Sequence, residues 1–282
     1  EAAAAATTLL AHASDEDTDL TLDAHLLAAR AFVDIGDHEA ARPHLDAARA
    51  QSGPDAPPLR RLSGLAGLAL GARIDGDSAG ARAYNEERLS LAEQHFPLAG
   101  YRAAIHLELA RDLLDEGDHA ALQDHARKAR ALAEESGNRD LLMRSYRYLA
   151  SSYFRNDELD AAVQLALAAR PLLDTVDVAD DKAFFLQFAT LALNLRGRFA
   201  AARAYTAALR EVSKSSANPL LGAIADLTVM HRLYVQGRFE ESRTFAASTR
   251  ARLESSRGAH AAIPLALSFE AIAAARGAPV AE

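Results

Sequence analysis

Cysteine and tryptophan are absent from the sequence, and aromatic residues make up only 6% of it. Without cysteine there is no disulfide framework, no thiolate zinc site and no cysteine nucleophile. The absence is compatible with reducing and oxidising compartments alike, so we expect a cytoplasmic location and keep a periplasmic one open. Alanine and leucine dominate instead, a profile typical of helices that pack closely against one another.

Long hydrophobic runs are missing too, and no segment is suited to cross a bilayer. The most apolar stretch spans residues 258–275. It is interrupted by His260, Pro264 and Glu270, so its apolar residues require a protein partner. The chain opens at Glu1 without the basic segment of a secretory signal, and the start without methionine favours a piece of a longer protein.

The motifs of common enzymes are not found. There is no phosphate-binding glycine loop, no His-Glu-x-x-His, no Gly-x-Ser-x-Gly and no EF-hand loop. Gly64, Gly67 and Gly71 lie in a predicted helix, where they favour close helix packing over nucleotide binding. The ten histidines are dispersed, whereas a metal site needs three or four converging ligands. We therefore expect no catalytic residue, no metal and no cofactor.

The net charge of −8 is spread unevenly. Residues 1–40 hold nine acidic residues against one arginine, which gives −8, whereas residues 198–257 hold ten basic residues against five acidic ones, which gives +5. The basic segment is dilute and is interrupted by acids such as Glu211 and Glu240. We interpret it as a solvated helix face and expect no contact with nucleic acid.

One short pattern recurs along the chain and determines the predicted fold. An apolar helix end is followed by Gly or Asn, then by a polar residue, then by small residues that begin another helix. The turn residues are Gly36, Gly76, Gly117, Asn156, Gly197, Gly237 and Gly277. Their spacings are 40, 41, 39, 41, 40 and 40 residues, a regularity that chance does not produce.

Each turn has a mechanical reason. The glycines, or Asn156 in the fourth repeat, take the left-handed conformation that ends a helix. An aspartate follows four of the turn residues and can cap the next helix. These aspartates are Asp37, Asp77, Asp118 and Asp157. Between turns, apolar residues at three- and four-residue intervals predict two helices of about 15 residues in each repeat, with twelve to fourteen helices and no sheet.

These features resemble the tetratricopeptide family. Its motif places a small residue five positions after the turn, where the second helix crosses the first. The residues at that place are Ala41, Ala81, Leu122, Ala161, Ala202 and Ser242, with Leu122 the exception. A small residue is also expected seven positions before the turn. There the sequence has Ala29, Ala69, Ala110, Leu149, Thr190 and Met230, of which Leu149 and Met230 do not fit.

The resemblance implies an all-α, right-handed α-solenoid of antiparallel helix pairs, with six to seven repeats and residues 1–282 as one array. A period near 40 is longer than the family's repeat of about 34 and is similar to longer-helix variants in bacterial regulators. The period makes residues 1–13 the second helix of a preceding repeat or an N-terminal cap. Pro279 stands where another helix would start.

The resemblance also implies a ligand groove lined by the first helix of each repeat, at positions roughly ten, six and three residues before the turn. Carried over, these positions give the candidate ligand-binding residues Arg73, Arg111, Tyr146, Tyr153, Gln187, Asn194, His231 and Tyr234. Asn194 and Tyr234 are expected at the position that Tyr153 holds in the fourth repeat. Tyrosine rings supply contact area and amides pair with a peptide backbone. The alternative is that the tyrosines pack between repeats with only the hydroxyl exposed.

The first hypothesis is therefore a non-enzymatic sensor or interaction module of a bacterial signalling protein, which binds a peptide, a protein segment or a small effector in the groove. The second is a self-association scaffold, a homo-oligomer in which the acidic first repeat meets the basic sixth repeat of a neighbour. The third is a regulatory domain of an enzyme, for example a diguanylate cyclase, or of a transcription activator. In that case the output domain lies outside this chain.

Overall fold

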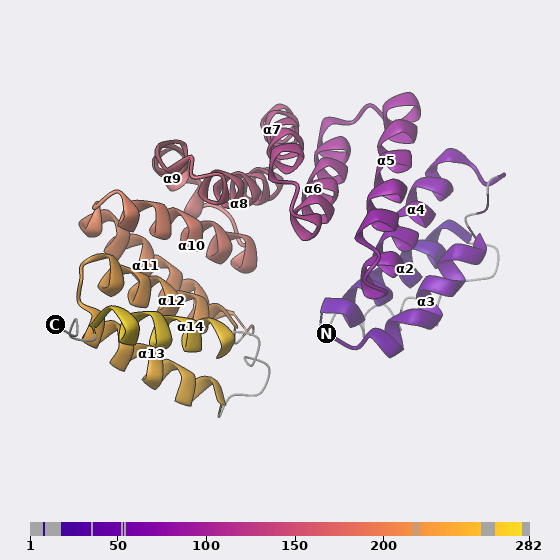
Figure 1. The fold of residues 1–282 in the computed structure, drawn as a ribbon. Helices are drawn as coiled ribbons and strands as arrows, with labels where there is room; N and C mark the ends of the chain where they lie inside the picture. Colours follow the sequence, from indigo (N-terminus) through magenta and orange to yellow (C-terminus); the bar gives the residue numbers. More distant parts are fainter. Residues whose placement is uncertain are drawn as a thin grey trace. The chain divides into compact units, whose positions relative to one another are not determined.

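A computed structural model of the protein describes residues 8, 18–34, 36–51, 53, 55–216, 218, 220–254 and 263–277. Almost all of these residues are helical, and none of them forms a strand (Figure 1). The chain divides into two compact units, Glu1–Gly137 and Asn138–Glu282, and each unit is described by itself.

Unit 1 contains three helix pairs joined by short turns. The pairs are α2 (Thr18–Asp34) with α3 (His38–Gln51), α4 (Pro58–Ile74) with α5 (Ser78–His95), and α6 (Ala99–Glu116) with α7 (His119–Ser136). One core cluster joins the second pair to the third through Leu62 and Leu65 of α4, Leu91 of α5, and Ile105 and Leu109 of α6. Leucine and isoleucine at these intervals bury one stripe of each helix against its neighbours.

Unit 2 contains three further pairs and one more helix. The pairs are α8 (Arg139–Arg155) with α9 (Leu159–Leu173), α10 (Ala179–Leu195) with α11 (Phe199–Ser215), and α12 (Leu220–Val235) with α13 (Phe239–Glu254), followed by α14 (Ile263–Gly277). The first helices pack against one another in the order α8, α10, α12, α14. The described residues form thirteen helices, in agreement with the twelve to fourteen expected. None of the described helices is both long and apolar enough to cross a membrane.

A residue with positive φ ends the first helix of every described pair. Glycine holds this place at positions 36, 76, 117, 197 and 237, with φ between 68° and 81°. In the fourth pair the prediction of Asn156 is wrong, because its φ is −86° and the left-handed residue is Asp157, with φ 59°. Aspartate tolerates this conformation because its short side chain bonds locally. Counted from Asp157, the spacings between the turns at 36 and 237 become 40, 41, 40, 40 and 40.

The shift by one residue also changes the capping of the fourth pair. Asp37, Asp77 and Asp118 each accept a hydrogen bond from the backbone N–H three residues further on, as predicted. Asp157 does not cap α9, because it is the turn residue itself. The helix begins after Glu158, whose side chain makes no capping hydrogen bond.

The helix crossings follow the corrected turns. The crossing residues with 0% exposure, five positions after each turn, are Ala41, Ala81, Leu122, Ala162, Ala202 and Ser242. Ala161 is only half-buried, so its assignment to the crossing is wrong. Seven residues before Asp157 stands Ala150, also 0% exposed, which restores the small residue that Leu149 did not provide. The mismatch at Leu149 and the wrong assignment of Ala161 therefore came from one misplaced turn.

The glycines of α4 act in packing, as expected. A Cβ atom added at Gly67 would lie 2.7 Å from Leu26 Cδ2 of α2, closer than real Cβ contacts allow. The N-terminal helix was expected over residues 1–13, which lie outside the described residues except for Thr8. The segment with Pro279 also lies outside them.

Two repeats of unit 1 contain the same histidine pair, in which His106 is buried and His25, His44 and His125 are half-buried. The Nδ1 atoms of His25 and His44 are 3.0 Å apart, and those of His106 and His125 are 2.9 Å apart. In each pair the first histidine lies eleven residues before a turn glycine and the second eight residues after it. Burial, together with the neighbouring His125, lowers the pKa of His106 to about 4. At neutral pH each pair is uncharged, and one ring can donate its N–H to the other.

Enlarging the crossing alanines tests the corrected turn. Ala162→Leu and Ala202→Leu should each lower the free energy of unfolding by about 1–3 kcal/mol, because extra methylenes overpack the contact between two helices. Ala161→Leu, one residue away and half-buried, is the matched control and should have a smaller effect. Urea unfolding midpoints measure all three variants. Midpoints of Ala162→Leu and Ala202→Leu equal to that of the parent would show that the crossing is misplaced.

Acidification should destabilise the protein through the histidine pairs. An unfolded histidine binds a proton near pH 6.5, whereas His106 in the folded chain binds one only near pH 4. Between these values the unfolded state holds more protons, so stability falls as the pH falls. From pH 7 to pH 5 the loss due to His106 should be about 2 kcal/mol. His106→Leu should flatten this pH dependence, whereas His95→Leu, at the exposed end of α5, should leave it unchanged.

Candidate functional site

Arg73, a predicted groove residue, lies at the centre of an ion-pair network between α4 and α6. Its Nη1 is 2.6 Å from Glu108 Oε2, and its Nε is 2.6 Å from Asp112 Oδ1. Asn85 of α5 donates a hydrogen bond of 2.8 Å to the other oxygen of Asp112. Because only 10% of the Arg73 side chain is exposed, this arginine joins two helices and offers little surface to a ligand.

Glu108 stays ionised within this network. Burial alone would raise its pKa, but the charges of Arg73, Arg30 and Arg111 outweigh burial and hold the pKa at about 2. Arg30 of α2 approaches to 3.5 Å, so the carboxylate connects three first helices. Arg111, the other predicted residue of unit 1, is half-buried on α6 beside Glu108.

In unit 2, two arginines of α8 share one carboxylate of α10. Arg144 Nε and Arg147 Nη1 lie 3.0 Å and 2.8 Å from the two oxygens of Asp181. The guanidinium of Arg147 also lies over the ring of Phe184, 4.4 Å from its centroid, and 5.1 Å from that of Tyr148. The cluster combines two guanidinium groups with one carboxylate, and the cation of Arg147 lies over two aromatic rings.

The same combination recurs two turns further along α8. The guanidinium of Arg155 lies 5.9 Å from the ring centroid of Phe188, and its Nε donates to Ser151 Oγ over 3.3 Å. The rings of Phe154 and Phe188 are 5.8 Å apart, and both side chains are half-buried. We call Arg147, Phe154, Arg155, Phe184 and Phe188 the arginine–phenylalanine face.

Polar residues follow on α10 and α12. Asn194 is fully buried, and its Nδ2 lies 3.4 Å from the Thr228 carbonyl oxygen and 3.5 Å from His231 Nδ1. Its Oδ1 has no hydrogen-bond partner. Burial lowers the pKa of His231 to about 4, so this histidine is neutral at neutral pH. Tyr234 is half-buried and packs edge-on against Phe239, with ring centroids 5.4 Å apart.

The remaining predicted residues differ in burial. Tyr146 is 6% exposed, with its ring centroid 6.2 Å from that of Phe185, so it packs between two first helices. Tyr153 and Gln187 are half-buried. With the turn at Asp157, the residue that matches Asn194 and Tyr234 in the fourth pair is Phe154, and the expected match of Tyr153 is wrong.

The eight predicted residues therefore divide between the units, Arg73 and Arg111 in unit 1 and the other six in unit 2. That they bind a ligand stays a prediction. The sequence-based search missed the arginine–phenylalanine face, although Arg147 and Phe154 stand ten and three residues before the corrected turn. For Arg147 and Phe154 the signal was present and was displaced by one residue, whereas Arg155, Phe184 and Phe188 stand two, thirteen and nine residues before their turns.

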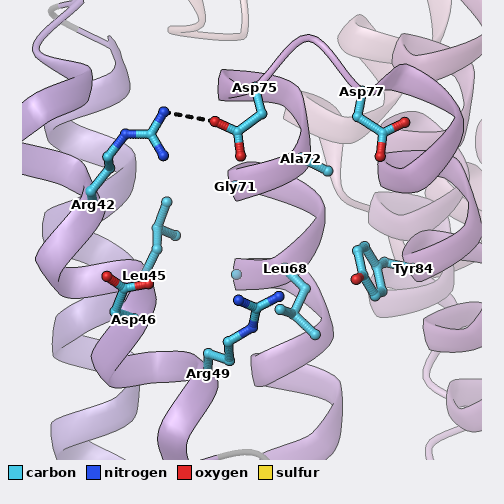
Figure 2. Close-up of a pocket in the computed structure, with 11 residues that line it drawn as sticks. Arg42, Leu45, Asp46, Arg49, Leu68, Gly71, Ala72, Asp75, Asp77 and Tyr84 are labelled. Atoms are coloured by element: carbon cyan, nitrogen blue, oxygen red, sulfur yellow. Dashed lines mark hydrogen bonds and ion pairs between the residues drawn. The ribbon is translucent and has the colours of Figure 1, made fainter.

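A cavity of about 280 Å³ lies in unit 1, where α3, α4 and α5 meet (Figure 2). Gly67 and Gly71 leave room along its floor, and Leu45, Leu68 and Tyr84 supply apolar walls. Arg42 and Asp75 close one end with an ion pair of 2.7 Å. Among the described residues, no three His, Asp or Glu side chains gather as metal ligands would.

Comparison with known proteins shows the fold and not a family. No protein-family model matches the chain, and no curated protein is detectably similar to it in sequence. Solved structures do resemble it. The apo form of the quorum sensor NprR from B. thuringiensis superposes with a TM-score of 0.67 at 13% identity, over 93% of this chain and 72% of that one.

Two further solved structures are similar to this chain. NprR in complex with its cognate peptide NprX gives a TM-score of 0.64 at 13% identity, over 96% of this chain and 78% of that one. The apo form of RapI gives 0.63 at 11% identity, over 90% and 97%. The predicted fold class, an all-α solenoid of antiparallel, tetratricopeptide-like helix pairs, is confirmed.

Removing the Arg73 cation should destabilise the protein far more than removing an exposed cation. Arg73→Met should lower the free energy of unfolding by about 3–5 kcal/mol, because it leaves the carboxylates of Glu108 and Asp112 buried without their cation. Arg42→Met breaks a pair whose side chains are 57% and 55% exposed, and should have an effect of about 1 kcal/mol or less. Chemical denaturation measures both variants. Equal losses would contradict a structural role for Arg73.

Proposed function

We propose that the chain is a non-enzymatic sensing and interaction module of a bacterial regulatory protein, and that it binds an extended peptide along α8, α10 and α12. The observation that carries the proposal is the arginine–phenylalanine face. Half-exposed rings and guanidinium groups alternate there over two adjacent first helices. Such a surface offers apolar contact area and positive charge together, the combination found at protein-binding hot spots.

The chemistry of this face favours one kind of peptide. Arg144 and Arg147 share the carboxylate of Asp181, and a carboxylate from a ligand would pair with the guanidinium edge of Arg147. Phe154 and Phe188 lie one to two helical turns away and suit an apolar side chain. We therefore propose a peptide in which an acidic residue, or the C-terminal carboxylate, stands a few residues from an apolar one.

His231 and Tyr234 would contact the other end of the peptide. Asn194 is fully buried, and its Nδ2 lies 3.5 Å from His231 Nδ1, so it would orient the peptide through His231. The half-buried Tyr234 ring adds contact area beside it. The predicted roles of Asn194 in orientation and of the tyrosines in affinity are retained in this proposal.

The neighbours in fold support a peptide as the ligand. One of the similar structures is NprR with its cognate peptide NprX, and NprR is a quorum sensor. At 13% identity these proteins share the fold with this chain, and the ligand class is transferred as part of the proposal. An array continuous over residues 1–282 and an output domain outside this chain belong to the same proposal.

A displayed library of random seven-residue peptides, selected on the immobilised chain, provides the probe. The strongest selected peptide is then titrated by calorimetry into the parent and into Arg147→Ala, Arg155→Ala and Tyr234→Ala. Each substitution in the contact surface should weaken binding by about 2 kcal/mol, or roughly thirtyfold. The selected peptides should be enriched in acidic and apolar residues.

Arg170→Ala on α9 is the matched control, since this exposed arginine lies on a second helix of the same unit. Thermal melting checks that every variant is folded. Affinity that drops for Arg170→Ala and stays unchanged for the other three would place the peptide on the second helices and refute the proposal. Selection that enriches no peptide would refute it as well.

A further inference from the structure

Unit 2 also contains a cavity, of about 420 Å³, which lies between α11 and α12. Its walls carry Arg203, Arg210 and Lys214 from α11 and Arg232 from α12. The one acidic residue among them is Glu211, so four positive charges and one negative charge leave a balance of +3. The chain as a whole has a net charge of −8, so this concentration of cations is local.

The cavity of Figure 2 occupies the equivalent place between α3 and α4. Arg42 and Arg49 stand six and thirteen residues after the turn at Gly36, as Arg203 and Arg210 do after Gly197. In unit 1 these arginines share their cavity with acids. Asp46 lies one helical turn from each of them on α3, and Asp75 pairs with Arg42 over 2.7 Å.

The same cation–acid pair recurs at the next interface of unit 1. Arg82, again six residues after a turn, lies 3.2 Å from Glu116, which stands one residue before the next turn. At both of these interfaces, an acidic residue one position before the turn forms an ion pair with an arginine of the preceding repeat. Both pairs join the second helix of one repeat to the first helix of the next.

In unit 2 every acid of this arrangement has been replaced. Ala207 stands at the position of Asp46, and Gln236 at the position of Asp75 and Glu116. Arg232 occupies the position of Gly71 and adds a cation where unit 1 has empty space. The side-chain oxygen of Gln236 is buried without a hydrogen-bond partner.

Two of the cations of this cavity are consequently left without a neutralising carboxylate. In the described part of the chain, no acidic side chain pairs with Arg203 or Arg232, whereas Lys214 pairs with Glu211 over 2.8 Å and Arg210 with Asp226 over 3.6 Å. Burial lowers the pKa of the half-buried Arg232, and Arg203, Arg210 and Arg238 lower it further by repulsion. Because these arginines repel one another, an anion that binds between them would stabilise the folded protein.

We propose that the cavity between α11 and α12 is a binding site for a small phosphate-bearing ligand, held by Arg203, Arg210 and Arg232. Phosphate matches the site better than a carboxylate, because a balance of +3 calls for more than one negative charge and a phosphate ester carries about two. Guanidinium groups also fit phosphate oxygens with two parallel hydrogen bonds. The site is separate from the peptide surface and goes beyond the function proposed above.

Calorimetric titration of inorganic pyrophosphate and of ADP into the full chain at low salt tests the site. Both ligands should bind and raise the melting temperature, because a ligand of the folded state stabilises it. Tighter binding of ADP would assign the rest of the cavity to a nucleoside, and equal binding would assign it to the diphosphate alone. Absence of binding by both would overturn the proposal.

Three variants separate this site from general attraction by positive charge. Arg232→Gln should weaken pyrophosphate binding at least about tenfold. Gln236→Glu should do the same while the unfolding midpoint stays equal or rises, since it restores the carboxylate found at Asp75 and Glu116. Arg42→Gln removes the same charge from the equivalent cavity of unit 1 and should leave binding unchanged. The site would be refuted if all three variants weakened pyrophosphate binding equally, or if none of them weakened it.

Discussion

The left-handed residue between the two helices of a pair is the constraint on which the rest of this structure depends. It fixes where the first helix ends, and hence which side chains before it face the neighbouring repeat. It also fixes the position, five residues later, where the second helix crosses the first. A buried alanine, or an equally buried Ser242 or Leu122, stands at that crossing in all six described pairs. The Arg42–Asp75 and Arg82–Glu116 ion pairs, the two histidine pairs and the two equivalent cavities recur at constant distances from the turn.

Most of the fold could be predicted because this constraint is local. A glycine after an apolar helix end is recognisable without knowledge of any distant contact. The fourth repeat shows where local information ends. Asn156 and Asp157 both tolerate positive φ, and nothing in their immediate sequence says which of them takes it. The packing of Ala162 and Ala150, which lie on either side of the turn, is consistent only with Asp157 as the turn residue.

The functional residues were harder to predict because their roles are decided by other helices. Arg73 was a reasonable ligand contact on its own helix, yet its partners Glu108 and Asp112 lie 35 and 39 residues away. Asn194 is likewise covered by α12, on which Thr228 and His231 stand. Arg147 and Phe154 were missed because of the one-residue error in the turn. Periodicity thus predicts which face of a helix turns inward, whereas burial and pairing depend on the neighbouring helix.

The near-constant interval between turns determines which changes of chain length this protein can tolerate. A one-residue insertion inside a helix would rotate the residues beyond it by about 100° and move the crossing alanine off its contact. Removal of 40 residues, from one left-handed residue to the next, would leave every remaining residue at its usual distance from a turn. Lineages of such proteins are therefore expected to lengthen and shorten by whole helix pairs, with single-residue gaps confined to the segments between pairs.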